Sequence, residues 1–128
     1  MDARKLAGRE AEAQCAQYLR SKGYEILAMN YSCRGGEIDI VAAQHTSRGI
    51  FRKTVSGYIA FVEVKQRTSR AFGEAREAVD RRKQQRIILA AKLYLSEHDT
   101  ELQPRFDVME VYPGKDGPVI NHIENAFE

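Results

Sequence analysis

Two short segments of the sequence combine the apolar character of a buried β-strand with ionisable side chains. The first covers residues 36–40 (Gly-Glu-Ile-Asp-Ile) and the second residues 61–65 (Phe-Val-Glu-Val-Lys). Both are apolar enough to lie in the middle of a sheet. Carboxylates and an ammonium group are costly to bury there unless they pair with one another or bind a metal ion. Such a conflict with the surrounding pattern is typical of a functional site.

The alternation of side chains along a strand predicts which of these groups lie together. In the first strand, Glu37 and Asp39 are expected on one face, and Ile38 and Ile40 on the other. In the second strand, one face is expected to be apolar, with Ala60, Val62 and Val64. The other face is expected to carry the ionisable groups Glu63 and Lys65, together with Ile59 and Phe61.

The composition predicts a single globular domain spanning residues 1–128. Hydrophobic residues make up 43% of the chain and charged residues 30%, which are ordinary values for a soluble protein. No apolar run is long enough to span a bilayer, and the start of the chain lacks the apolar core of a secretion signal. Cys15 and Cys33 are read as free thiols in a reducing cytoplasm. The three histidines, His45, His98 and His122, are scattered singly, which disfavours a zinc site.

Charge is distributed unevenly along the chain, although the net charge is only +2. Residues 65–86 contain eight Lys or Arg and three acids, a local balance of +5. Residues 97–128 contain eight acids and two bases, a balance of −6. The basic segment indicates an anionic partner, with nucleic acid the leading candidate. The alternative is a solvated helix face with ion pairs along the helix.

Apolar periodicity and turn residues predict the order helix, three-strand meander, helix, strand, within an α/β fold whose mixed sheet is flanked by helices. The helices are expected at residues 3–22 and 75–96, the second being the longest. Strands are expected at residues 24–31, 37–43, 58–66 and 105–112, with a short edge strand at 119–123. A polar loop is expected at 44–57, and turns near Arg34-Gly35, Phe72-Gly73 and Pro113-Gly114.

An acid, a spacer and a lysine are weak evidence alone, because such a triplet occurs about once by chance in a chain of this size. A glutamate on the first helix adds to it. On a helical wheel Glu12 lies beside Cys15 and Leu19, at the margin of the core-facing stripe, whereas Glu10 points to solvent. The alternative is that Glu12 is a boundary residue paired with a neighbour.

These residues together resemble the PD-(D/E)xK nuclease superfamily, which has a restriction-endonuclease-like fold. More closely, the chain resembles the YraN family of predicted endonucleases, which is itself similar to archaeal Holliday junction resolvases. The most specific part is the order Gly36-Glu37-Ile38-Asp39 followed by Val62-Glu63-Val64-Lys65. Ile38 replaces the proline of the superfamily name and carries no chemistry. Ala11 replaces a glycine that usually precedes the helix glutamate, and the 44–57 loop is longer than usual.

The resemblance implies hydrolysis of phosphodiester bonds assisted by Mg²⁺, with Mn²⁺ as a substitute. The metal ligands would be Asp39, Glu63 and the backbone carbonyl of Val64, with Glu12 binding a second metal or orienting a water. Lys65 would position the attacking water, help to deprotonate it, or stabilise charge on the phosphate. Glu37 is either a peripheral ligand or the partner of an arginine, and we favour the second.

A purely structural interpretation is that Asp39, Glu63 and Lys65 form a buried cluster of ion pairs. Such clusters are often no more stabilising than packed apolar residues, which argues against it. Lys83 falls within the apolar stripe of the second long helix, so it either extends to solvent or points toward phosphate. The backbone contacts to nucleic acid are predicted to be Lys83, Arg86, Arg67 and Arg70, with Arg81 and Arg82 as weaker candidates. Asp107 is interpreted as a structural hydrogen-bonding residue.

The leading functional hypothesis is therefore a Mg²⁺-dependent endonuclease acting on DNA. A preference for branched DNA and a homodimeric state are implied only by the resemblance to the resolvases. One alternative is a module that binds nucleic acid without cutting it. Another is a protein-interaction factor that docks through its acidic C-terminal quarter.

Overall fold

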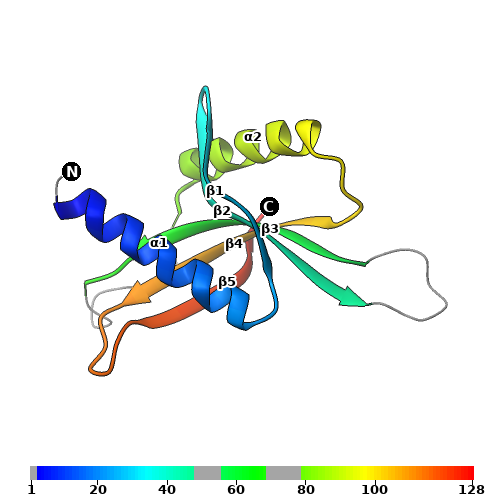
Figure 1. Cartoon of the computed structure of the whole chain (residues 1–128). Coiled ribbons are helices and arrows are strands. Elements are labelled where there is room, and N and C mark those ends of the chain that lie inside the picture. The colour runs from blue at the N-terminus through cyan, green and yellow to red at the C-terminus, as the bar shows by residue number, and fades with distance from the viewer. Residues whose placement is uncertain (1–2, 48–55, 69–78) are drawn as a thin grey trace.

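A computed structural model describes residues 3–47, 56–68 and 79–128. In chain order the elements are α1 (Ala3–Ser21), β1 (Glu25–Cys33), β2 (Gly36–Ser47), β3 (Ser56–Gln66), α2 (Arg81–Glu97), β4 (Gln103–Tyr112) and β5 (Val119–Phe127). The strands form one sheet with a helix packed on each face (Figure 1). No helix in the described part of the chain has the length and apolar character needed to cross a membrane.

The sheet is mixed, and its strands lie in the order β1-β2-β3-β4-β5. β3 and β4 are parallel, and the other neighbouring pairs are antiparallel. α2 makes the crossover between the two parallel strands, as such a connection requires. This arrangement confirms the α/β class and is consistent with the predicted restriction-endonuclease-like fold.

Each helix covers its own apolar cluster. Beneath α1 the cluster consists of Ala11, Cys15, Ala16, Leu19, Tyr24, Ile40, Ala42, Ala60, Val62, Met109 and Val111. Beneath α2 it consists of Ile38, Val41, Ile59, Phe61, Ile87, Ala90, Ala91, Tyr94, Val108 and Phe127. The two faces of β3 are therefore as predicted, with Phe61 and Ile59 on the α2 side and Val62 and Ala60 on the α1 side.

Several predicted boundaries are wrong. The second helix was expected at residues 75–96 and to be the longest, but α2 begins at Arg81 and has 17 residues against 19 for α1. Asp80 caps α2, since its side chain accepts a hydrogen bond from the Lys83 amide. The strands are also longer than predicted: β2 extends to Ser47, into the expected 44–57 loop, and β5 extends to Phe127. The expected turn at 72–73 lies outside the described residues, as does the start of the predicted helix at 75–78.

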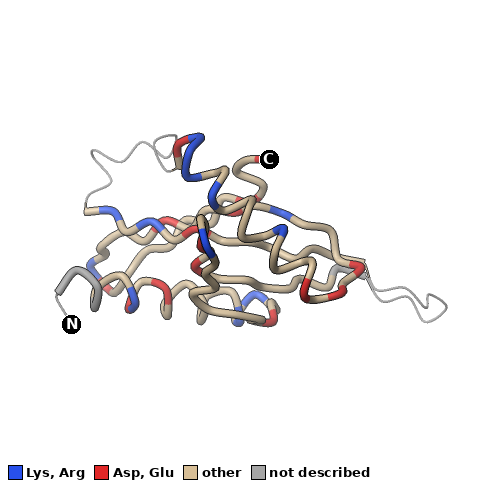
Figure 2. Tube along the Cα trace, turned by 90° about the horizontal axis from the view of Figure 1, so that it is seen from above, with Lys and Arg blue, Asp and Glu red and all other residues tan. Residues whose placement is uncertain are grey.

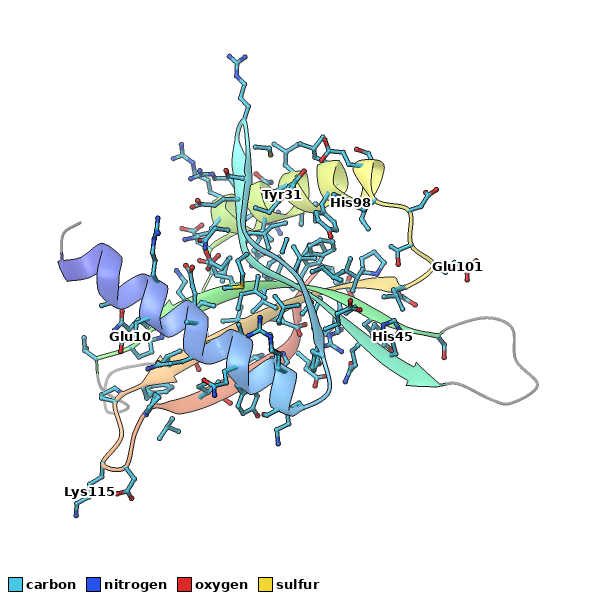
Figure 3. The ribbon with its side chains drawn as sticks, in the orientation of Figure 1. Glu10, Tyr31, His45, His98, Glu101 and Lys115 are labelled. Carbon is cyan, nitrogen blue, oxygen red and sulfur yellow. The ribbon has the colours of Figure 1, made fainter. Side chains whose placement is uncertain are left out.

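The β1–β2 hairpin changes direction at Asp39, which makes one face prediction wrong. Ile38 packs beneath α2, whereas Ile40, two residues later, packs beneath α1. The paired register of β2 with β3 begins at Ile40, and the Asp39 carboxylate takes the hydrogen bond of a β3 amide instead. The end of the hairpin leaves the sheet and rises beside α2 (Figure 1). The hydroxyl of Tyr31, which is labelled in Figure 3, donates a hydrogen bond to Glu97 on α2.

A buried polar network joins β4 and β5 to Tyr24, the residue that precedes β1. The Arg105 guanidinium makes two hydrogen bonds to Asp107, at 2.9 and 2.8 Å, and Asp107 is completely buried. Arg105 also donates to the Tyr24 hydroxyl, and Asp107 accepts from the Asn125 amide. The His122 ring lies 2.7 Å from Asp107. These contacts confirm the structural interpretation of Asp107.

Candidate active site

Two carboxylates and two ammonium groups lie together where β2 and β3 diverge. Asp39 Oδ2 accepts a hydrogen bond of 2.8 Å from the Val64 amide, which ties the β2 carboxylate to β3. Glu63 is only 4% exposed, and its Oε1 lies 2.9 Å from Lys83 Nζ on α2 and 3.9 Å from Lys65 Nζ. Three elements therefore contribute to one polar cluster inside a largely apolar sheet.

α1 adds a third carboxylate, that of Glu12, which is half-buried. Burial raises its pKa, as do the nearby charges of Glu63 and Glu37, whereas a hydrogen bond from the Asn30 side chain lowers it. Oε1 of Glu12 is buried and has no hydrogen-bond partner among the residues that the structure describes. Glu10 is exposed on α1, as predicted (Figure 3).

Asn30 is a site residue that the sequence analysis missed. Met29 pairs with Ile40 and Tyr31 with Ile38, so Asn30 faces Asp39 where the hairpin bends. Its φ of 52° is in the left-handed region, which asparagine tolerates better than most residues. The bend turns its side chain toward Glu12. An asparagine in an otherwise apolar strand was the available signal, but nothing in the sequence indicated its backbone conformation.

The positive charge around Asp39 is too small to offset the burial of its carboxylate and the nearby negative charges. Burial raises its pKa from the ordinary 3.8 to about 8, and the neighbouring charges of Glu63 and Glu12 add to that effect. The Val64 amide and Lys83 oppose it without cancelling it. Two acidic neighbours within electrostatic range and a buried environment are conditions that a bound cation relieves.

The two lysines respond differently to the same surroundings. Burial lowers the pKa of Lys65, and so does the positive charge of Lys83, while Glu63 partly compensates. Burial also lowers the pKa of Lys83, but the hydrogen bond to Glu63 and the negative charges of Glu63, Asp39 and Glu37 together outweigh it, so the pKa is raised overall. Lys83 is thus held firmly as a cation, whereas Lys65 is closer to releasing its proton.

The donor set suits a hard, oxygen-binding cation such as Mg²⁺. In the described part of the chain, no three His, Cys, Asp or Glu side chains are arranged as a ready-made metal cage. Mg²⁺ does not require one, because it keeps several waters and is commonly held by one or two carboxylates. The cluster offers Asp39 and Glu63, and the unpartnered Oε1 of Glu12 is a further oxygen. These are the oxygen donors that would hold the cation that the resemblance implies.

The residues predicted to contact nucleic acid have different surroundings. The first turns of α2 are strongly basic (Figure 2) and contain Arg81, Arg82, Lys83 and Arg86. Arg86 is exposed. Arg67 forms an ion pair of 3.1 Å with the completely buried Glu110, which gives it a structural partner. Arg70 lies outside the described residues. Glu37 is exposed, beside the cluster.

A cavity of about 520 Å³ lies away from this cluster, where β3 and β4 begin and β5 ends; Tyr58, Arg105 and Phe127 are among the residues that line it. None of the predicted catalytic residues contributes to its walls. The residues predicted to be catalytic therefore lie in the charged cluster described above and not in this cavity. The cavity is lined instead by members of the Arg105 network.

Comparison with known proteins shows the family. The model of the uncharacterised protein family UPF0102 matches residues 11–111, which include Glu12, Asp39, Glu63, Lys65 and Lys83. A UPF0102 protein of Caldanaerobacter subterraneus subsp. tengcongensis is 43% identical over 128 residues, covering 97% of this chain and 96% of that protein. Relatives from Methylococcus capsulatus and Pelotomaculum thermopropionicum are 38% and 40% identical, each covering 98% of this chain and 93% and 98% of their own length. The resemblance to the YraN family is thereby confirmed, and the chain belongs to the UPF0102 family.

Proposed function

We propose that this protein is a divalent-cation-dependent endonuclease that hydrolyses phosphodiester bonds in DNA. The observation that carries the proposal is the cluster of Asp39, Glu63 and Lys65, in which a half-buried acid, a buried acid and an amine meet at the divergence of β2 and β3. If these residues formed only a structural cluster of ion pairs, their positive and negative charges would balance. Here Asp39 and Glu12 both have raised pKa values because burial and acidic neighbours disfavour their ionised forms.

Each group in the cluster has a role in the proposed reaction. Asp39, Glu63 and the Val64 carbonyl hold the cation, and Glu12 either holds a second one or orients the attacking water. When bound, the cation supplies Lewis-acid stabilisation of charge on the phosphate. Lys65 positions the water and stabilises negative charge that develops on the phosphate oxygens. The basic first turns of α2 bind the nucleic-acid backbone without reading its sequence.

The experiment is a cleavage assay on single-stranded, duplex, flap and four-way DNA, with Mg²⁺, with Mn²⁺, and with the metals removed by a chelator. Asp39→Asn and Lys65→Ala are the test variants, and Lys115→Ala, exposed in the β4–β5 turn, is the matched control. We expect metal-dependent cutting by the unchanged protein and the control. The two test variants should lose it by about 10³-fold or more.

A second measurement does not depend on cleavage. Mg²⁺ should raise the melting temperature of the unchanged protein, since a ligand that binds the folded state stabilises it. Asp39→Asn should abolish that rise. Cutting that survives in both test variants would refute the proposed centre. Salt-sensitive DNA binding with no cleavage under any condition would instead favour the non-catalytic module.

A further inference from the structure

Glu63 is neutralised by a lysine from another element of the fold. Lys83 Nζ lies 2.9 Å from Glu63 Oε1, closer than the 3.9 Å of Lys65 Nζ to the same oxygen. The Glu63 side chain is 4% exposed and the Lys83 side chain 38% exposed. A buried acid is therefore paired with an ammonium group that has access to solvent.

The position of Lys83 is fixed by two separate features of α2. Asp80 caps the helix and accepts a hydrogen bond of 2.8 Å from the Lys83 amide, so Lys83 lies in the first turn. One turn later, the helix is seated against Gly36, where an added Cβ would lie 2.2 Å from the Arg86 carbonyl oxygen. Since Gly36 is three residues before Asp39, this close contact sets the helix relative to the carboxylates.

We propose that Lys83 is an internal counter-ion of Glu63 that a divalent cation must displace, and that a nucleic-acid phosphate then binds the released ammonium group. This rests on the proposed function, because it assigns Lys83 a part in loading the same centre. Lys83 and the cation would compete for Glu63 Oε1, and two cations on one carboxylate oxygen repel strongly. The four-carbon stem of lysine allows the ammonium group to move outward without a change in the helix.

The consequence is positive coupling between metal and nucleic acid. A phosphate that binds the ammonium group of Lys83 leaves Glu63 free for the cation. Conversely, a cation bound to Glu63 leaves the ammonium group of Lys83 free for a phosphate. The coupling is reciprocal by thermodynamic necessity. A purely structural Lys83–Glu63 ion pair makes a different prediction: its loss would lower stability and leave the coupling of metal and nucleic acid unaltered.

The first test measures the affinity for Mn²⁺ in the absence of nucleic acid, by electron paramagnetic resonance of the free ion. Lys83→Met should bind Mn²⁺ about tenfold more tightly than the unchanged protein. Lys83→Arg, which keeps the charge, and Lys92→Met, a matched change at an exposed position of α2, should bind as the unchanged protein does. Equal or weaker binding by Lys83→Met would overturn the proposal.

The second test repeats the titration with a short duplex made of phosphorothioate linkages, which are cut slowly. The duplex should tighten Mn²⁺ binding to the unchanged protein and to Lys92→Met by about tenfold, and to Lys83→Met by less than about twofold. The same tightening in all of these proteins would overturn the proposal. Lack of cleavage with this coupling intact would refute only the endonuclease function. Normal cleavage with unaltered Mn²⁺ affinity in Lys83→Met would refute only the counter-ion role.

Discussion

Asp39 Oδ2 accepts a hydrogen bond of 2.8 Å from the backbone amide of Val64, at the point where the paired register of β2 and β3 stops. The same carboxylate thus completes the sheet and contributes to the candidate site. Burial raises its pKa to about 8, so in the absence of metal the fold favours the neutral form. The stability that this form provides is complete below the ordinary value of 3.8 and is lost as pH rises toward 8.

Asp39→Asn should therefore stabilise the metal-free protein at alkaline pH. The amide oxygen can still accept the hydrogen bond from Val64, and it carries no charge to bury. We expect a gain of about 1–3 kcal/mol in the free energy of unfolding above pH 8 and little gain near pH 4, measured by urea unfolding in a chelator. A gain that does not vary with pH would contradict the raised pKa.

Gly36→Ala should destabilise the fold and displace α2. The new Cβ would lie 2.2 Å from the carbonyl oxygen of Arg86 and 3.3 Å from the Cβ of Ala90, and backbone cannot yield as a flexible side chain does. We expect a loss of about 1–3 kcal/mol in urea unfolding, with reduced cleavage because Lys83 moves with the helix. Gly8→Ala is the control: among the described residues, nothing beyond its chain neighbours and the backbone of its own helix lies within 4 Å of an added Cβ. Alanine there should stabilise the protein by about 0.5–1 kcal/mol.

Two substitutions of Asn30 should separate backbone strain from the contact with Glu12. Glycine at position 30 tolerates the φ of 52° but lacks the side-chain amide that contacts Glu12. Alanine lacks the amide and also disfavours that backbone conformation. Cleavage should fall by about tenfold in each variant, since each lets Glu12 lose its orientation. Only Asn30→Ala should lose a further 1 kcal/mol or so of stability. Equal stability of the two variants would show that the left-handed conformation carries no cost.

Asp107→Ala should cost about 3–5 kcal/mol, because it leaves Arg105 buried without its main partner. Glu124→Ala is the matched control on the same guanidinium. Glu124 lies 3.3 Å from Arg105 but is largely exposed, so its removal should cost less than about 1 kcal/mol. Neither change should alter the cleavage rate per folded molecule, and a selective loss of cleavage in Asp107→Ala would argue for a catalytic role.

The sequence predicted the class of the fold, and it predicted the two faces of β3 because the side chains of that strand alternate regularly. The alternation of side chains wrongly predicted that Ile38 and Ile40 share a face, because it assumes a strand that stays paired in its sheet. The regular pairing of β2 with β3 ends at Asp39. The beginning of α2 was misplaced because alanine and glutamate before Asp80 favour a helix, whereas the cap at Asp80 decides where it starts.

Contacts between distant segments could not be predicted at all. The sequence indicated that Lys83 lies within an apolar stripe, but the partner, Glu63, depends on how α2 is seated on the hairpin at Gly36. Likewise, the sequence predicted that Arg67 contacts nucleic acid. Its ion pair with Glu110 could not be foreseen, because that pair depends on the parallel register of β3 and β4.

Cys15, in the cluster beneath α1, is completely buried, and burial raises the pKa of its thiol to about 12. Nucleophilic attack requires the thiolate, so this sulfur is inert while the helix stays on the sheet. The rate at which a thiol reagent labels Cys15 therefore measures how often α1 detaches from the sheet. The half-buried Cys33 near the end of the hairpin provides the reference signal within the same molecule.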